Sequence, residues 1–374
     1  MYKLSSLLPL VCFCLHGFTQ DMPSDKNAGS QTVQLYQNLK KYRSEGFMFG
    51  HQDDLAYGVN WKYIPGKSDI KDVTGDYPAV YGWELGHLEL DSSKNLDGVP
   101  FAAMKHFIAT AYNRGGVITI SWHFTNALTG KSAWDTTHGA VAAILPGGEK
   151  NGLYKSWLDK IAAFMLDLKG SNGEAIPVIF RPFHELNGSW FWWGKNQCTP
   201  EEIKNLYRFT VAYLRDTKQV HHLLYAFNTD RFSSEGEYLE RFPGKEWVDI
   251  IGFDIYQRGK DNQQFIHDLD HMLTVLEKLA AEYNKIPALT EFGYGSLPDS
   301  TWWTQVLLPA IGTHKIAYAL AWRNAGKSPR GNYEYYVPFK GEASAPDFLK
   351  FYNDKRTLFQ KGVTKERLYG KKKF

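Results

Sequence analysis

The chain alternates between short apolar runs and longer stretches in which apolar residues recur at helical spacing. Runs of the first kind, bounded by turn residues and rich in aliphatic and aromatic side chains, predict buried β-strands. There are eight: residues 46–52, 79–85, 116–123, 176–185, 221–228, 248–256, 286–293 and 316–324. Stretches of the second kind predict helices over residues 25–45, 101–115, 153–170, 199–216, 265–284 and 347–359. The helix at 199 has the clearest start, because Thr199, Pro200 and Glu202 fit an N-cap, a first helical position and a capping box.

Strands that alternate with helices predict parallel βα units, and eight such units close a (β/α)8 TIM barrel, an α/β fold. No Pro/Ser/Gly-rich linker and no shift in composition divides the chain, so residues 21–374 are expected to form one barrel domain. Two longer connections, 124–152 and 325–345, are rich in Gly, Ser, Thr and Asn. They are expected to be surface loops that shape a cleft.

The first twenty residues are typical of a secretory signal peptide. Lys3 precedes an apolar stretch over residues 4–18, and small or polar residues follow at Thr19 and Gln20. This stretch is too short to span a bilayer, and the residues before Cys12 and Cys14 fit lipidation poorly. Residues 1–20 are therefore predicted to be removed on export to the periplasm or the medium. The mature chain would keep a single cysteine, Cys198, which excludes an intramolecular disulfide.

Composition narrows the class of partner. A hydrophobic fraction of 43% with 22% charged residues is that of a globular protein with a sizeable core. The net charge of +3 gives no support to nucleic-acid binding, and the only basic run is 371–373 at the end of the chain. Aromatic residues reach 15%, with 12 Trp and 22 Tyr, and these side chains offer the flat apolar faces and polar tips that suit sugar rings.

Polar and ionisable residues recur at the ends of the predicted strands and are scarce inside them. They are His51, Glu84, His123, His184, Glu185, Asn228, Asp254, Tyr256, Glu291, Trp322 and Arg323. In a barrel the carboxyl ends of the strands meet at one face, where barrel active sites lie. These side chains are therefore expected to share one site.

Two of them, Glu185 and Glu291, are glutamates that follow apolar strands. A carboxylate pair among aromatic side chains is what glycoside hydrolysis needs: one carboxyl donates a proton to the leaving oxygen, and the other stays ionised to attack or to activate water. The alternative is that both are structural ion-pair partners, for instance of Arg181. The two glutamates alone leave both interpretations open.

The segment "RPFHELNGSWFWWG" at 181–194 resembles the acid/base motif of glycoside hydrolase family 26, which is best known for β-mannanases. "SWH" at 121–123, "GFDIY" at 252–256, "TEFG" at 290–293 and "AWRN" at 321–324 resemble further motifs of that family, in the family's order. The resemblance implies a retaining mechanism with Glu185 as acid/base and Glu291 as nucleophile, about 5 to 5.5 Å apart.

The same resemblance implies roles for six further residues. His184 would hold sugar hydroxyls, His123 would line the donor subsites, and Tyr256 would hydrogen-bond the nucleophile. Trp190 would lie on the acceptor side of the cleavage point, and Trp322 would form a platform under the donor sugar with Arg323 beside it.

Other residues in or near these motifs are not assigned to the catalytic centre. Trp192 and Trp193 are expected to pack the motif against the barrel. Glu84, His87, Trp134 and Asp135 are candidates for sugar contacts further along the cleft. His51, His123 and His184 are dispersed among strand ends, so no histidine metal site is expected. His221 and His222 lie at a strand start, the end of a barrel that serves stability.

The sequence therefore predicts an exported, monomeric endo-β-1,4-mannanase acting on mannan, glucomannan or galactomannan. No cofactor is needed, because the chemistry uses carboxylates and water. Three alternatives stay open: an enzyme that releases mannobiose from a chain end because loop 124–152 blocks the cleft, a relative acting on mixed-linkage β-glucan or β-1,3-xylan, and a glycan-binding barrel without turnover.

Overall fold

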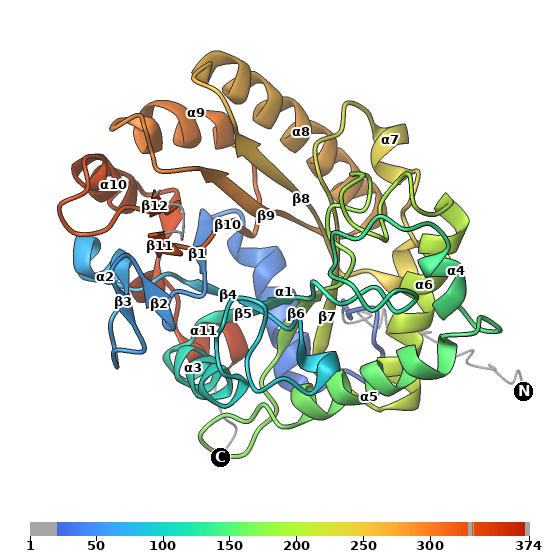
Figure 1. Cartoon of the computed structure of the whole chain (residues 1–374). Coiled ribbons are helices and arrows are strands. Elements are labelled where there is room, and N and C mark those ends of the chain that lie inside the picture. Colours follow the sequence, from blue (N-terminus) through green and yellow to red (C-terminus); the bar gives the residue numbers. More distant parts are fainter. Residues whose placement is uncertain (1–20, 328–330, 332, 371–374) are drawn as a thin grey trace, which may run out of the picture.

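The protein is a closed barrel of eight parallel strands surrounded by helices (Figure 1). The computed structural model describes residues 21–327, 331 and 333–370; the predicted signal peptide lies outside them. Each strand pairs in parallel with the next around the ring, and β10 pairs with β1 to close it. The barrel strands are β1 (Phe47–Gln52), β4 (Val80–Glu84), β5 (Val117–Ser121), β6 (Val178–Arg181), β7 (Leu223–Thr229), β8 (Ile250–Gln257), β9 (Ile286–Tyr294) and β10 (Tyr318–Ala321).

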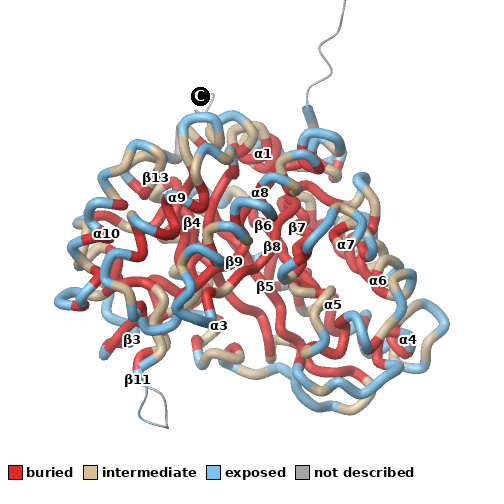
Figure 2. The backbone as a smooth tube through the Cα atoms, turned by 90° about the horizontal axis from the view of Figure 1, so that it is seen from above, coloured by how far each residue is buried: buried red, intermediate tan, exposed pale blue. Residues whose placement is uncertain are grey.

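All eight predicted strands are confirmed, with ends that differ by a few residues. Their residues are almost all buried, which Figure 2 shows as a red centre inside a mixed outer layer. This burial follows from the apolar runs in the sequence, because a parallel sheet is covered on both faces.

Helices cover the outside of the barrel. They are α1 (Ser30–Tyr42), α2 (Asp69–Thr74), α3 (Phe101–Arg114), α4 (Ala140–Ile144), α5 (Asn151–Leu166), α6 (Pro200–Ala212), α7 (Glu235–Leu239), α8 (Asn262–Tyr283), α9 (Leu308–Ile311), α10 (Ala345–Tyr352) and α11 (Lys365–Tyr369). The capping box at Thr199 and Glu202 is confirmed, with Pro200 in the first turn. Short 3₁₀ segments occupy Leu88–Leu90, Lys245–Trp247 and Gln360–Gly362, and π-helical segments occupy Tyr213–Thr217 and Trp303–Leu307.

The predicted helix at 347–359 is only partly correct. Helix α10 ends at Tyr352, and Thr357–Leu358 form a short strand, β13, that pairs in parallel with the start of β1. The turn between them is closed by Asp354, whose carboxylate accepts hydrogen bonds from the backbone N–H and the Nε of Arg356. This turn ends the helix although the apolar spacing continues.

The two long connections carry structure of their own. Loop 124–152 contains α4, and loop 325–345 contains the hairpin of β11 (Gly326–Lys327) and β12 (Tyr333–Glu334). This hairpin lies beside a second one, β2 (Tyr57–Gly58) and β3 (Trp61–Lys62), on the left of Figure 1. Among the described residues, no helix combines the length and apolar character needed to cross a bilayer.

Candidate active site

A cleft of about 1050 Å³ opens at the carboxyl ends of the strands. Seven of the eight predicted site residues line it: His123, His184, Glu185, Trp190, Tyr256, Glu291 and Trp322. They come from five different strand ends or the loops that follow them. The expectation that the polar strand ends share one site is therefore confirmed for these residues.

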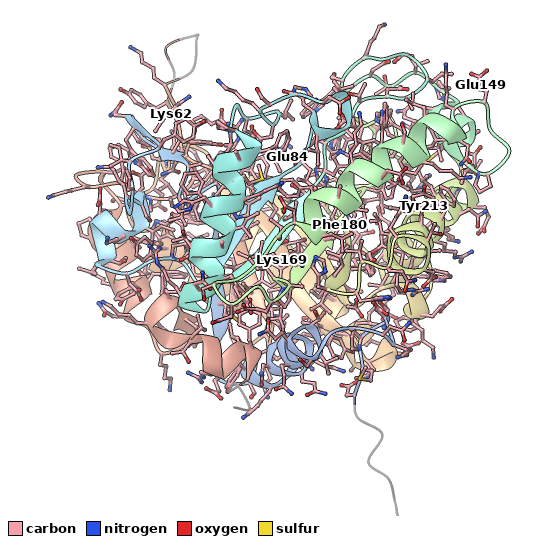
Figure 3. The ribbon with its side chains drawn as sticks, turned by 90° about the horizontal axis from the view of Figure 1, so that it is seen from below. Lys62, Glu84, Glu149, Lys169, Phe180 and Tyr213 are labelled. Carbon is pink, nitrogen blue, oxygen red and sulfur yellow. The ribbon has the colours of Figure 1, made fainter. Side chains whose placement is uncertain are left out.

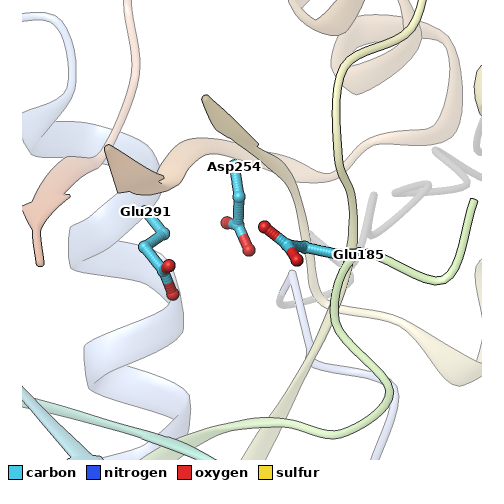
Figure 4. Close-up of side chains that lie close together, drawn as sticks. All are labelled: Glu185, Asp254 and Glu291. Carbon is cyan, nitrogen blue, oxygen red and sulfur yellow. The ribbon is translucent and has the colours of Figure 1, made fainter. Parts of the chain in front are cut away.

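Three carboxylates gather at the floor of this cleft. One oxygen from each of Glu185, Asp254 and Glu291 lies within 4.8 Å of the others (Figure 4). Like charges at this separation disfavour one another's ionised forms, so the surrounding donors decide which group keeps its proton.

Glu291 is buried at the end of β9 and is surrounded by donors. The Nη2 of Arg181 donates to Glu291 Oε2 at 2.8 Å, and the hydroxyl of Tyr256 donates to Oε1. Burial works against the charged form of Arg181, but Asp254 and Glu291 outweigh it and raise the pKa of the guanidinium. Glu291 therefore lies beside a permanent cation and accepts hydrogen bonds at both of its oxygens.

Glu185 has the opposite environment. Burial, followed by the negative charges of Asp254 and Glu291, raises the pKa of this carboxyl well above its usual range. The Nε1 of Trp190 donates a hydrogen bond to its Oε2 at 2.6 Å. The backbone of Glu185 has a φ of 51°, and that of Phe183 a φ of 53°. Such left-handed conformations are uncommon outside glycine and occur at sites where side chains are aimed for function.

Asp254 accepts hydrogen bonds from three side chains at the base of the cleft. Its Oδ2 accepts from Arg181 Nη1 and from Asn228 Nδ2, both at 2.8 Å, and its Oδ1 accepts from Thr290 Oγ1 at 2.8 Å. Sequence reasoning placed it at a strand end without a role. A carboxylate cluster also resembles a set of oxygen ligands for a divalent cation, but these oxygens are already directed at protein donors.

One wall of the cleft is made of rings. His123 and His184 face each other with their Nε2 atoms 2.9 Å apart. The ring of Trp134 stacks on His123 at 5.3 Å and 16°, and Phe191 meets the same ring at 5.3 Å and 70°. Trp134 is 49% exposed, so it presents an aromatic face to the cleft. Its loop is pinned by Asp135, which accepts from the hydroxyls of Thr129 and Thr137.

The cleft is also lined by Trp322 and by a residue that the sequence did not single out, Tyr336. The ring of Tyr336 meets that of Tyr256 edge-on at 5.6 Å. Asn324 fixes the segment that carries it, because its Oδ1 accepts from the backbone N–H groups of Tyr336 and Val337. No regular pattern marks this segment, so only the fold reveals its place.

The remaining candidates do not line the cleft. Arg323 does not line it and pairs with Asp97, at 3.4 Å between Nε and Oδ1. Glu84 and His87 do not line it either. Trp192 and Trp193 are fully buried, and their indole N–H groups donate to the carbonyls of Phe124 and His184, which confirms their packing role.

Comparison with known proteins gives a consistent picture. The model described as "Glycosyl hydrolase family 26" matches residues 24–330. A mannan endo-1,4-β-mannosidase of Bifidobacterium adolescentis is 36% identical over 356 residues, which are 90% of this chain; the chain spans only 35% of that relative's length. A mannan endo-1,4-β-mannosidase of Bacillus subtilis is 27% identical over 73% of this chain and 78% of its own length.

Solved structures of the same family superpose on this chain. A GH26 β-mannanase from Bacteroides ovatus superposes with a TM-score of 0.88 at 42% identity, covering 92% of this chain and 99% of that chain. GH26C from Muricauda sp. superposes with a TM-score of 0.85 at 33% identity, covering 94% and 97%.

Proposed function

The chain belongs to glycosyl hydrolase family 26, and from that premise we propose that it is a retaining endo-β-1,4-mannanase acting on mannan, glucomannan or galactomannan. The observation that carries the proposal is the unequal pair of Glu185 and Glu291. One carboxyl has a raised pKa, and the other accepts hydrogen bonds from Arg181 and Tyr256 in the same cleft. Retaining enzymes need this division between a proton donor and an ionised nucleophile.

The reaction has two steps. A carboxylate oxygen of Glu291 attacks the anomeric carbon while Glu185 gives its proton to the departing glycosidic oxygen, which leaves a glycosyl ester on Glu291 and frees the acceptor chain. Glu185, now ionised, then takes a proton from water as that water attacks the anomeric carbon. The sugar leaves with its original configuration, and both carboxyls return to their starting states.

The geometry supports this scheme on two counts. Carboxylate oxygens of Glu185 and Glu291 come within 4.8 Å of each other, which is the short separation of retaining enzymes rather than the wider gap that holds a water. Trp190 donates to Glu185, and both Trp190 and Trp322 line the cleft; in the proposed reaction Trp190 would lie on the side of the leaving group and Trp322 would form a platform for the donor sugar. His123 and His184 would contact hydroxyls of that donor sugar.

Substitution of the two glutamates tests the proposal. Glu185→Ala and Glu291→Ala should each abolish turnover of a soluble mannan while circular dichroism stays that of the unaltered protein. Azide should restore turnover by forming β-glycosyl azide in Glu185→Ala and α-glycosyl azide in Glu291→Ala, because each variant lacks a different partner of the reaction. Normal activity in either variant would overturn the assignment, and sugar binding without any turnover in the unaltered protein would favour a glycan-binding barrel.

The mode of attack is a separate question. Trp134, on the loop that follows β5, lines the cleft, and a loop in this position could close one end so that only mannobiose leaves. The time course of products from unbranched mannan and mannohexaose distinguishes the two: a ladder of oligosaccharides early in digestion means endo-attack, and mannobiose alone means a chain-end enzyme. A mixed-linkage β-glucan and a β-1,3-xylan run alongside test the other linkages.

We further propose that the enzyme is exported and acts as a monomer. Residues 1–20 have the pattern of a secretory signal. Determining the N-terminus of the protein secreted by a bacterial host would test the first point, since cleavage near Thr19 or Gln20 is expected. Light scattering of the purified protein would test the second.

A further inference from the structure

Glu84 is a buried carboxylate that the reaction does not use. It lies at the end of β4, is 0% exposed, and Figure 3 shows it well inside the outline of the molecule, with Lys62 and Glu149 near the edge. Its Oε1 accepts from the backbone N–H groups of Gly86 and His123, both at 2.6 Å. Its Oε2 accepts from Ser121 Oγ at 2.7 Å and lies 2.8 Å from the Nδ1 of His123.

These contacts determine the charge of Glu84. Burial raises the pKa of the carboxyl, but its interactions with the ring and backbone of His123 and with the hydroxyl of Ser121 outweigh burial and lower the pKa to about 2. An ionised carboxylate only accepts hydrogen bonds, so the proton between the two side chains must be on His123 Nδ1.

The position of this proton fixes that of the next one. When His123 is neutral and carries its proton on Nδ1, its Nε2 can only accept. The neighbouring atom is His184 Nε2, at 2.9 Å, which must then be the donor. Because His184 is buried next to His123 and the charged Arg181, its pKa lies well below the usual range, and His184 is neutral. With His123 neutral, one buried carboxylate therefore sets the proton positions of two rings that line the cleft.

We propose that Glu84 is a positioning residue for the donor side of the cleft: through His123 it fixes the orientation and the proton positions of both histidine rings before a sugar binds. A carboxylate behind a histidine holds the tautomer and the ring orientation of that histidine in many sites. The sugar then meets a single hydrogen-bonding pattern, which lowers the cost of ordering the site. The consequence for catalysis rests on the function proposed above, whereas the proton arrangement does not.

Glu84→Gln is the informative variant, because it keeps the shape of the side chain and reverses one hydrogen bond. The glutamine carbonyl can still accept from the backbone N–H groups of Gly86 and His123. Its amide N–H would point at His123 Nδ1, which must then accept, so the proton of His123 moves to Nε2 and His184 becomes the acceptor.

Two measurements test this. Long-range ¹H–¹⁵N spectra of protein with ¹⁵N-labelled histidine report which ring nitrogen carries each proton. We expect Nδ1–H on His123 in the unaltered protein and Nε2–H in Glu84→Gln. We also expect kcat/KM on mannohexaose to fall roughly tenfold to a hundredfold, with KM raised. An Nε2–H signal for His123 in the unaltered protein overturns the proposal without any variant, so failure of Glu84→Gln to fold leaves it testable.

Asp54→Asn is the matched control. Asp54 forms a similar buried pair with a histidine, at 2.8 Å between its Oδ1 and the Nδ1 of His51, and neither residue lines the cleft. This variant should keep the tautomer of His123 and the kcat/KM of the unaltered enzyme, whatever it does to the melting temperature. Equal losses of kcat/KM in both variants would mean that Glu84 is merely structural. If the unaltered protein does not hydrolyse mannohexaose, the proposed function fails while the spectra still decide the proton arrangement.

Discussion

At the scale of single residues, the carboxyl group of Glu185 lies in an environment that disfavours its ionised form. The raised pKa of Glu185 comes from burial and from the negative charges of Asp254 and Glu291, and it keeps the proton that the leaving oxygen needs. The same environment costs stability once that proton is lost. Between its unfolded pKa, near about 4.3, and its raised folded pKa, the native state holds a proton that the unfolded state has released, so stability falls as the pH rises through this window.

Glu185→Gln should therefore be more stable than the unaltered protein at neutral pH, and the difference should shrink towards pH 4. Denaturant unfolding at a series of pH values between 4 and 8 would measure it. The pH profile of kcat/KM for the unaltered enzyme should fall on the alkaline side as Glu185 loses its proton. A stability difference that grows towards acid pH would contradict the assigned direction of the shift.

The hydroxyl of Tyr256 contacts the proposed nucleophile, Glu291. It donates to Glu291 Oε1, and hydrogen bonds to charged groups contribute about 1.5 to 3 kcal/mol. Tyr256→Phe should lower kcat/KM on mannan about ten- to a hundredfold, with little change in the melting temperature. Tyr225→Phe is the control, because the hydroxyl of Tyr225 is buried without a hydrogen-bond partner among the described residues. Equal activity in Tyr256→Phe and the unaltered enzyme would remove this role.

At the scale of elements, the end of β9 and the segment after β12 pack closely at Gly293, where a larger residue would meet the ring of Tyr336. A Cβ added to Gly293 would lie 2.3 Å from Cδ1 of Tyr336 and 2.9 Å from Cε1 of Tyr256, so one of these rings would have to move. Because the hydroxyl of Tyr256 donates a hydrogen bond to Glu291, a displaced Tyr256 ring would disturb the site. Gly293→Ala should therefore lower kcat clearly while it changes the free energy of unfolding little. Two residues further on, a Cβ at Gly295 would meet Tyr336 only at 3.7 Å. Gly295→Ala should therefore retain most of the activity in a parallel assay of mannan hydrolysis.

The same scale explains what the sequence could predict. The eight barrel strands could be predicted because each is an apolar run buried on both faces, and the two glutamates proposed as catalytic could be predicted because they end such runs. The hairpins β2–β3 and β11–β12 were missed because their strands have two residues each and leave no periodic pattern. Glu84 and Glu185 both end a predicted strand, so the sequence does not show which of them faces the cleft. In the structure Glu84 ends β4 and pairs with His123 without lining the cleft, whereas Glu185 follows β6 and lines it.

At the scale of the whole molecule, the barrel is completed by its C-terminal segment. Helix α10 and strand β13 lie beyond residue 330, where the match to the family model ends. Phe348, Phe351 and Phe359 from this segment surround Phe49 of β1, with ring centroids 5.4, 5.6 and 4.9 Å away. Strand β13 pairs with the start of β1 beside this cluster. The first barrel strand is therefore held by residues about three hundred positions later in the chain.

Phe351→Ala should destabilise the whole barrel rather than its last helix. Removing a fully buried phenylalanine costs about 3 to 5 kcal/mol, a large share of the about 5 to 15 kcal/mol that holds a domain folded. Because Phe351 packs on a barrel strand, unfolding should stay a single transition, followed by tryptophan fluorescence and by loss of mannan hydrolysis at the same denaturant concentration. Tyr333→Ala is the control, since Tyr333 is 43% exposed on the β11–β12 hairpin and should change the midpoint little. An early transition in Phe351→Ala that leaves activity intact would show instead that the C-terminal segment folds as a separate unit on a finished barrel.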